Sequence, residues 1–151
     1  MQVDFNLPER FDVTYRTADN TSERPWMLHR ALFGSIERFL GILIEHTSGN
    51  LPLWLAPTQA VIIPIADRHV EAAEQVAAEL RAHGGRVEVY EQNEPMRVKI
   101  AKAQGQRVPY MLVIGDKEVE NGEVAVRERH EGDLGSMKLE YFTKIIEEAQ
   151  V

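Results

Sequence analysis

Residues 26–46 constrain the fold of this chain most strongly, because they combine helical length with apolar side chains over most of the circumference. One apolar stripe repeats at the spacing of successive helical turns and consists of Leu32, Ile36, Phe39 and Leu43. This periodicity predicts a helix from Arg30 onward that is largely buried.

Arg38 is the unusual residue of this predicted helix, because a cation is rarely buried without a partner. Gly34 and Gly41 lie at i−4 and i+3 from it, which predicts a flat surface of bare backbone beside the guanidinium. Such a surface suits a planar ring, and the guanidinium fork suits a phosphate. Composition alone favours a simpler interpretation, in which the glycines permit helix–helix packing and Arg38 pairs with a carboxylate such as Glu45.

Composition and charge narrow the class of protein. A chain of 151 residues is expected to form one domain, or a small domain with an appendage. The formal net charge of −7 argues against a general nucleic-acid binder. Residues 95–115 nevertheless carry no acidic side chain and four basic ones, which indicates either a positioned anion contact or a solvated helix face. The basic residues are Arg97, Lys99, Lys102 and Arg107.

Compartment and membrane signals point to the cytoplasm. The chain has no cysteine, so disulfides and thiolate chemistry are excluded. Its N-terminus lacks the basic and apolar regions of a secretory signal, and its apolar runs are too short for a predicted membrane span.

The first third of the chain is expected to be an incomplete half of a larger structure. Residues 1–7 alternate between apolar and polar side chains, which predicts a strand that ends at Pro8. Residues 16–25 are expected to form a polar loop, and residues 48–50 to stop the long helix. Residues 51–57 carry a proline near each end and are interpreted as a stiff linker, so we place a domain boundary near Pro57.

The second part, residues 57–151, has the pattern of a small α/β domain. Strands are expected at 60–65, 86–90 and 109–115. A helix at 68–83 is expected to be capped by Asp67, and Pro95 is expected to open a second helix that ends near residue 105. This alternation implies right-handed crossovers and a parallel core. Asn121-Gly122 predicts a tight turn between strands at 114–119 and 123–129, residues 132–135 a further turn, and residues 138–149 a final amphipathic helix. The predicted fold class is a mixed sheet with a parallel core, flanked by helices.

Few residues suggest chemistry by their pattern alone. His29 could ligate zinc, but a tetrahedral site needs three or four ligands and the other histidines are scattered. Two interpretations of His29 stay open: one ligand whose partners lie outside this chain, or an ordinary histidine at a helix terminus. Polar residues near predicted strand ends fit either a binding surface or ordinary loops. They are Asn93, Arg107, Glu118 and Arg127.

Residues 27–46 resemble the third signature motif of class II aminoacyl-tRNA synthetases in its threonine-specific form. Residues 2–8 and 53–57 are similar to that family as well, as are Asn93-Glu94, residues 107–120 and Val126-Arg127. The resemblance extends over nearly the whole chain. It implies that residues 1–56 are the end of a class II catalytic domain and residues 57–151 an anticodon-binding α/β domain of the threonyl-tRNA synthetase family.

This resemblance also implies roles for single residues. Arg38 is similar to the motif arginine that grips the ATP phosphates, and Gln2 and Ser35 resemble residues that line the threonyl-adenylate pocket. His29 is similar to one of three ligands of a zinc ion that holds the amino and hydroxyl groups of threonine and so rejects valine. The residues implied to read splayed anticodon bases are Asn93, Arg107, Glu118 and Arg127.

The family's other two zinc ligands and its first two class II motifs are not found in this chain. We therefore expect the chain alone to be inactive and to bind neither ATP nor zinc by itself. Its expected contribution is recognition of the anticodon loop of threonine-specific tRNA, within an enzyme that activates threonine with ATP and transfers it to tRNA. The alternative is a stand-alone module, derived from such a synthetase, that binds a protein partner or self-associates through its apolar helix.

Overall fold

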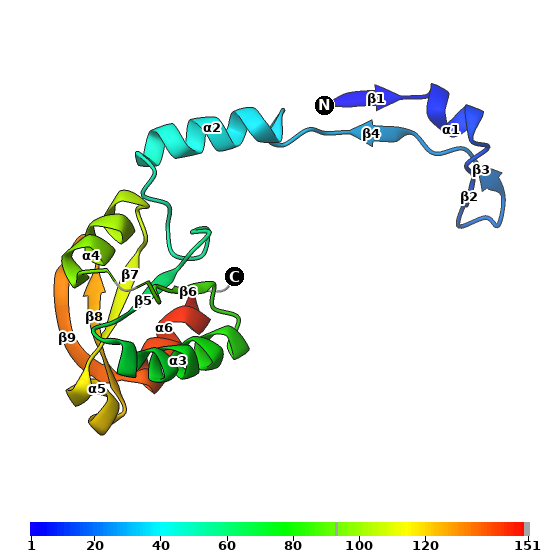
Figure 1. Ribbon diagram of the computed structural model, residues 1–151. Coiled ribbons are helices and arrows are strands. Elements are labelled where there is room, and N and C mark those ends of the chain that lie inside the picture. The colour runs from blue at the N-terminus through cyan, green and yellow to red at the C-terminus, as the bar shows by residue number, and fades with distance from the viewer. Residues whose placement is uncertain (93, 150–151) are drawn as a thin grey trace. The chain divides into compact units, whose positions relative to one another are not determined.

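The computed structural model describes residues 1–92 and 94–149 of the chain, which is drawn in Figure 1. Contacts between residues divide the chain into two compact units, a first unit of Met1–Leu43 and a second unit of Ile44–Val151. Within the described ranges, no helix has both the length and the apolar character needed to cross a membrane.

The first unit contains two short antiparallel strand pairs. Strand β1 (Gln2–Asp4) pairs with β4 (Met27–His29). Strand β2 (Tyr15–Arg16) pairs with β3 (Ser22–Glu23), and all of this pair except Tyr15 lies in the segment expected to be a loop. The opening strand is shorter than predicted, because the Asp4 carboxylate accepts the backbone N–H groups of Asn6 and Leu7 at 2.8 and 3.0 Å. These bonds turn the chain into helix α1 (Asn6–Arg10), so Pro8 lies within a helix instead of ending a strand.

Helix α2 (Ile36–Thr47) begins later than the apolar pattern predicted. Gly34 adopts a left-handed φ of 67°, and the first helical hydrogen bond runs from the Phe39 N–H to the Ser35 carbonyl at 3.0 Å. Gly34 therefore lies outside the helix. Of the two glycines predicted to flank Arg38 on the helix surface, only Gly41 does so. The helix stops as predicted, with left-handed Ser48 and Gly49.

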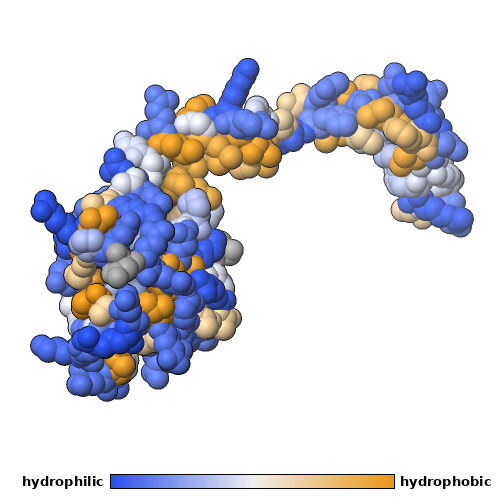
Figure 2. All heavy atoms as spheres, viewed as in Figure 1, coloured by the Kyte–Doolittle hydropathy of each residue, from blue (hydrophilic) through white to orange (hydrophobic). Residues whose placement is uncertain are grey.

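The prediction that this helix is largely buried is wrong within the described structure, since none of its residues is buried. Figure 2 shows hydrophobic side chains gathered along α2. Periodicity identifies an apolar face but carries no information about what covers it.

A five-stranded mixed sheet forms the centre of the second unit, in the order β6-β5-β7-β8-β9. Strand β5 pairs in parallel with β6 and β7, whereas β8 is antiparallel to both β7 and β9. The strands are β5 (Ala60–Pro64), β6 (Val87–Val89), β7 (Tyr110–Ile114), β8 (Glu123–Glu128) and β9 (Gly132–Lys138). The helical segments are η1 (Asp67–His69), α3 (Val70–Ala82), α4 (Met96–Gly105), α5 (Asp116–Asn121) and α6 (Leu139–Glu148). The predicted fold class is confirmed.

Helices cover both faces of the parallel core, which explains why β5 is buried at all five positions. One face packs against α3 and α6, where Phe142 is fully buried and meets Tyr110 edge to face at 5.3 Å between ring centroids. The other face packs against α4 through Ala103 and Ile100. Helix α3 ends as predicted, with Gly84 left-handed at φ 80°. Asp67 lies inside η1, so its predicted role as the cap of α3 is wrong.

The predicted hairpin around Asn121-Gly122 is also wrong. Residues Asp116–Asn121 form helix α5, and Gly122 ends it with a left-handed φ of 64°. The hairpin is built instead by β8 and β9, so residues 132–135 lie in a strand and not in a turn.

The connecting segment, defined as residues 51–57, is bonded to the second unit by side chains. Gln59 is fully buried; its amide Nε2 donates to the Leu53 carbonyl at 3.0 Å, and its Oε1 accepts the Arg86 N–H at 3.0 Å. The Arg86 guanidinium donates to the carbonyls of Ala56 and Trp54 at 3.0 and 2.8 Å. The segment interpreted as a linker is thus an integral part of this folded unit.

Candidate functional site

Two of the predicted residues face each other in the first unit. Gln2 on β1 is the register partner of His29 on β4, and the His29 Nε2 lies 3.1 Å from the Asp4 Oδ2. The backbone N–H of Leu7, with that of Asn6 and the His29 ring, holds the pKa of the Asp4 carboxyl below its usual value. The described residues contain no group of three or more side chains that could hold a metal ion. His29 and Asp4 alone therefore do not fit a zinc site.

Ser35 and Arg38 lie together at the start of α2. The Ser35 hydroxyl donates to the Glu37 carboxylate at 2.6 Å, which lowers the pKa of Glu37, and it accepts the Arg38 N–H at 3.4 Å. The Arg38 side chain is exposed, and no ion pair or side-chain hydrogen bond joins it to another described residue. The predicted pairing with Glu45 is absent from the described structure, so the guanidinium remains open to an anion.

Arg107 occupies the turn between α4 and β7 and has an unusual backbone. Its φ is 59°, in the left-handed region that side chains other than glycine rarely adopt. Its carbonyl accepts a 2.7 Å hydrogen bond from Nη1 of Arg129, and its N–H donates to the Gln104 carbonyl at 3.1 Å. The backbone of Arg107 is therefore fixed on both sides, while its side chain is exposed.

Arg129 is a structural residue that the sequence analysis did not single out. Besides the bond to Arg107, its guanidinium Nη2 donates to the Leu51 carbonyl at 3.1 Å, and its N–H donates to the Pro109 carbonyl at 2.9 Å. It thereby joins the connecting segment, the turn before β7 and the end of β8. No local signal predicts this, because its partner Leu51 lies 78 residues away in sequence.

Arg127 lies close to this group. It is the register partner of Met111 on β7, so its exposed side chain projects from the sheet face that packs against α4. Arg107, Arg127 and Arg129 gather at the end of β7 where Tyr110 begins the strand. We call these three residues the arginine edge.

Glu118 lies beyond the other end of β7, in the first turn of α5. Its Oε2 accepts the Gly115 N–H at 3.0 Å, and its side chain lines a cavity of about 370 Å³ bounded by α3, α5, β8 and the start of α6. The structure thus brings Arg107 and Arg127 together and places Glu118 at the opposite end of the strand. Asn93, the fourth residue implied to read bases, lies outside the described residues.

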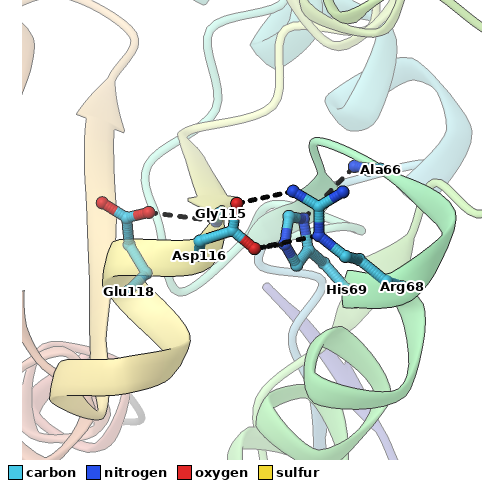
Figure 3. Close-up of polar contacts among 6 residues, drawn as sticks. All are labelled: Ala66, Arg68, His69, Gly115, Asp116 and Glu118. Atoms are coloured by element: carbon cyan, nitrogen blue, oxygen red, sulfur yellow. Dashed lines mark hydrogen bonds and ion pairs between the residues drawn. The ribbon is translucent and has the colours of Figure 1, made fainter.

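A polar cluster that the sequence did not predict lies beside Glu118 (Figure 3). The Asp116 carboxylate accepts hydrogen bonds from Arg68 Nε at 2.9 Å, Arg68 Nη2 at 2.5 Å and His69 Nε2 at 2.8 Å. These bonds, those from Arg68 foremost, hold the pKa of the Asp116 carboxyl well below its usual range. We call Arg68, His69 and Asp116 the Asp116 cluster.

Family comparisons agree with this architecture. Residues 59–149 match the model of the anticodon binding domain, and residues 1–47 match that of the tRNA synthetase class II core domain (G, H, P, S and T). The fold and the site therefore define a class II synthetase module, and the chain belongs to the anticodon binding domain family.

The particular relatives are threonine–tRNA ligases, as the sequence resemblance predicted. The chain is 54% identical to that of Phocaeicola vulgatus and 54% identical to that of Aquifex aeolicus, in each case over 98% of this chain and 23% of the relative. A solved structure of the RNA binding domain of threonyl-tRNA synthetase from Cryptosporidium parvum Iowa II is also similar, with a TM-score of 0.87 and 35% identity over 99% of this chain and 38% of that chain. The chain spans less than a quarter of the length of these curated relatives.

Proposed function

We propose that this chain reads the anticodon loop of threonine-specific tRNA, as part of an enzyme that activates threonine with ATP and transfers it to the tRNA. The observation that carries the proposal is the arginine edge. On a chain with a net charge of −7, general attraction for RNA is weak, so positioned cations are needed to hold the phosphate backbone and present the bases.

The placement of the implied residues suggests how a loop would be read. Arg107 and Arg127 would bind at one end of β7, and Glu118 would accept hydrogen bonds from a base at the other. A strand of five residues spans roughly 15 Å, more than the roughly 10 Å of three stacked nucleotides. The bases are therefore expected to be splayed, as in sequence-specific recognition of single-stranded loops.

The test is binding of the chain to threonine-specific tRNA and to a version with an exchanged anticodon, each at low and high salt. A preference for the correct anticodon that persists at high salt would show base readout instead of phosphate attraction. Arg107→Ala should lower the affinity for the correct tRNA. The control is Arg10→Ala, which removes the same charge from the first unit. Equal affinity for both tRNAs, or no effect of Arg107→Ala, would contradict the proposal.

In the complete enzyme, the proposed roles of the first unit follow the family. Arg38 would bind ATP phosphates, Gln2 and Ser35 would line the adenylate pocket, and His29 would contribute one zinc ligand. For ATP, the implied role rests on the exposed Arg38 alone. For zinc, no third donor joins His29 and Asp4 among the described residues. We therefore propose that this chain is inactive alone. Measurable threonine-dependent ATP–pyrophosphate exchange by the purified chain would contradict this.

We propose a functional boundary near Pro57, between residues 1–56 and 57–151, because the family matches end at residue 47 and resume at residue 59. The structural division lies earlier, between Leu43 and Ile44, and residues 51–57 fold with the second unit. We place the protein in the cytoplasm, as expected for a relative of tRNA ligases.

A second candidate function, a stand-alone module that self-associates or binds a protein partner, is favoured by the exposed apolar face of α2. Ile36, Leu40 and Ile44 are 65%, 44% and 51% exposed, and burial of such side chains is favourable. Sedimentation velocity distinguishes the candidates. A double variant, Ile36→Ser with Leu40→Ser, should reduce self-association and leave anticodon preference intact. Arg107→Ala should reduce anticodon preference and leave self-association unchanged. Self-association together with an absence of anticodon preference would favour the second candidate.

A further inference from the structure

Asp116 joins the two loops that leave the carboxyl ends of the neighbouring parallel strands β5 and β7. Pro64 and Ile114, the last residues of these strands, are register partners. Arg68 and His69 follow β5, Asp116 follows β7, and all three bonds described above cross between them (Figure 3). This edge of an open α/β sheet is where such folds generally bind ligands.

The hydrogen bonds of His69 allow only one tautomer of its ring. Its ring is buried, with 3% of the residue exposed, and its Nδ1 accepts the Ala66 N–H at 3.3 Å. The ring hydrogen must then be on Nε2, which donates it to Asp116. Since both ring nitrogens are used inside the cluster, His69 fixes the start of α5 instead of offering a free group to a ligand.

Glu118 depends on the same helical turn. Asp116 is the first residue of α5 and Glu118 the third, and a helix of six residues is too short to be stable without tertiary contacts. Oε2 of Glu118 is held by the Gly115 N–H, whereas its Oε1 makes no hydrogen bond with a described residue. Figure 3 shows the Glu118 carboxylate on the side of this turn away from Arg68 and His69.

The packing at Gly115 is tight enough to transmit a displacement. A Cβ at this position would lie 2.7 Å from Cδ1 of Ile65, which follows β5, and 3.0 Å from Oε2 of Glu118. The first turn of α5 therefore packs closely against the exit of β5. A shift of Asp116 relative to Arg68 and His69 would move Glu118 with it.

We propose that the Asp116 cluster is the positioning device for Glu118, presenting its free carboxylate oxygen to an amino-bearing base of the anticodon loop. This inference rests on the proposed function, in which Glu118 reads a base. An ionised carboxylate accepts hydrogen bonds and donates none, so the partner group must be a donor, such as the N1–H and N2 amine of guanine. A base whose edge at this point carries acceptors would be rejected, because the carboxylate would face a second acceptor.

The experiment measures discrimination between anticodon-loop RNAs with and without the amino group, using inosine in place of each guanosine in turn. Glu118→Gln keeps the cap, because its amide oxygen can still accept the Gly115 N–H, but it presents a donor to the base. Asp116→Asn is nearly isosteric, yet its amide nitrogen is a donor that faces the donors of Arg68 or His69. The control is Asp67→Asn, which makes the same charge change in the same region, at a side chain that no hydrogen bond or ion pair joins to another described residue.

Glu118→Gln and Asp116→Asn should each reduce the preference for guanosine over inosine at one position by about tenfold or more, which corresponds to about 1.5 kcal/mol for one hydrogen bond to a charged group. The double variant should lose little more, because both changes act on the same contact. Asp67→Asn should keep the preference and bind both RNAs as the wild type does.

Two results would overturn the inference, and a third would contradict the proposed function instead. If Glu118→Gln loses the preference and Asp116→Asn retains it, the cluster does not position Glu118. If Asp116→Asn weakens binding of both RNAs equally, its role is structural alone; hydrogen exchange at the Val119 N–H, which donates to the Gly115 carbonyl at 3.1 Å, reports whether α5 has unfolded. If Glu118→Gln itself retains the preference, the base-reading role of Glu118 is wrong.

Discussion

Replacement of Arg129 by methionine should both destabilise the second unit and weaken RNA binding, whereas the same change at Arg127 should weaken RNA binding alone. The Arg129 guanidinium donates to the carbonyls of Arg107 and Leu51 at 2.7 and 3.1 Å. Arg127 is exposed on β8, two residues before Arg129, and its side chain makes no ion pair or hydrogen bond with a described residue. The two variants thus remove the same charge from one surface but differ in the bonds they break.

The expected loss of stability follows from these contacts. A hydrogen bond from a charged group contributes about 1.5–3 kcal/mol when protected from water, and about 1 kcal/mol is reasonable for each of two bonds at a half-exposed site. Methionine keeps most of the apolar stem, so packing changes little. A total of about 2 kcal/mol corresponds to a fall in Tm of roughly 8 °C for a unit of this size.

The effect on RNA binding has a separate cause. The left-handed backbone of Arg107 costs on the order of 1 kcal/mol and persists because its surroundings hold it. Without the donor from Arg129, the turn should relax and move the Arg107 side chain, so affinity for the correct tRNA should fall further than in Arg127→Met.

Thermal unfolding followed by circular dichroism and tRNA binding at two salt concentrations test both expectations. Loss of one cation should reduce the salt dependence of binding by a similar amount in the two variants. The reasoning is refuted if Arg129→Met unfolds at the wild-type temperature, or if Arg127→Met is destabilised equally.

Three further predictions concern stability. Phe142→Ala should lower the free energy of unfolding by about 3–5 kcal/mol in guanidinium titrations, because the ring is fully buried. Gly85→Ala should lower the Tm, since its Cβ would lie 2.8 Å from the backbone carbonyl oxygen of Leu80, whereas Gly105→Ala, with nothing within 4 Å, should not. The pKa of Asp116 lies below its ordinary value of 3.8, so its carboxylate stabilises the fold above that pH and less as the pH falls. The stability difference between wild type and Asp116→Asn, from urea titrations between about pH 3 and pH 7, should therefore be largest near neutrality and should shrink below about pH 4.

Most of the second unit could be predicted because its signals are local. The apolar run of β5, the single apolar face of α3 and the glycine after it each specify an element without reference to the rest of the chain. The alternation of strands and helices then implied the parallel core, which β5, β6 and β7 form. The resemblance to synthetase motifs identified the family that the comparisons confirm.

Helix α5 was missed because one local signal has two meanings. Asn-Gly favours a tight hairpin turn, but a glycine with positive φ also ends a helix, as Gly122 does. Glu118, three residues after Gly115, is the glutamate of a capping arrangement and was the signal that favoured a helix.

The remaining features are non-local. His69 and Asp116 are 47 residues apart in sequence, and Arg129 and Leu51 are 78 apart, so no spacing rule predicts either pair. The onset of α2 depends on the left-handed backbone of Gly34, which an apolar period cannot reveal.

The bonding of the connecting segment determines where this protein can be cut. Side chains of the second unit donate to the carbonyls of Leu51, Leu53, Trp54 and Ala56. A chain that began at Pro57 would remove these acceptors and leave the fully buried amide of Gln59 without one of its partners, at a cost of about 1–3 kcal/mol for that group alone. The family match begins at residue 59, but we expect a stable truncated chain to begin no later than Leu51, so that all four carbonyls are kept. Truncated versions made for crystallisation or NMR should start there.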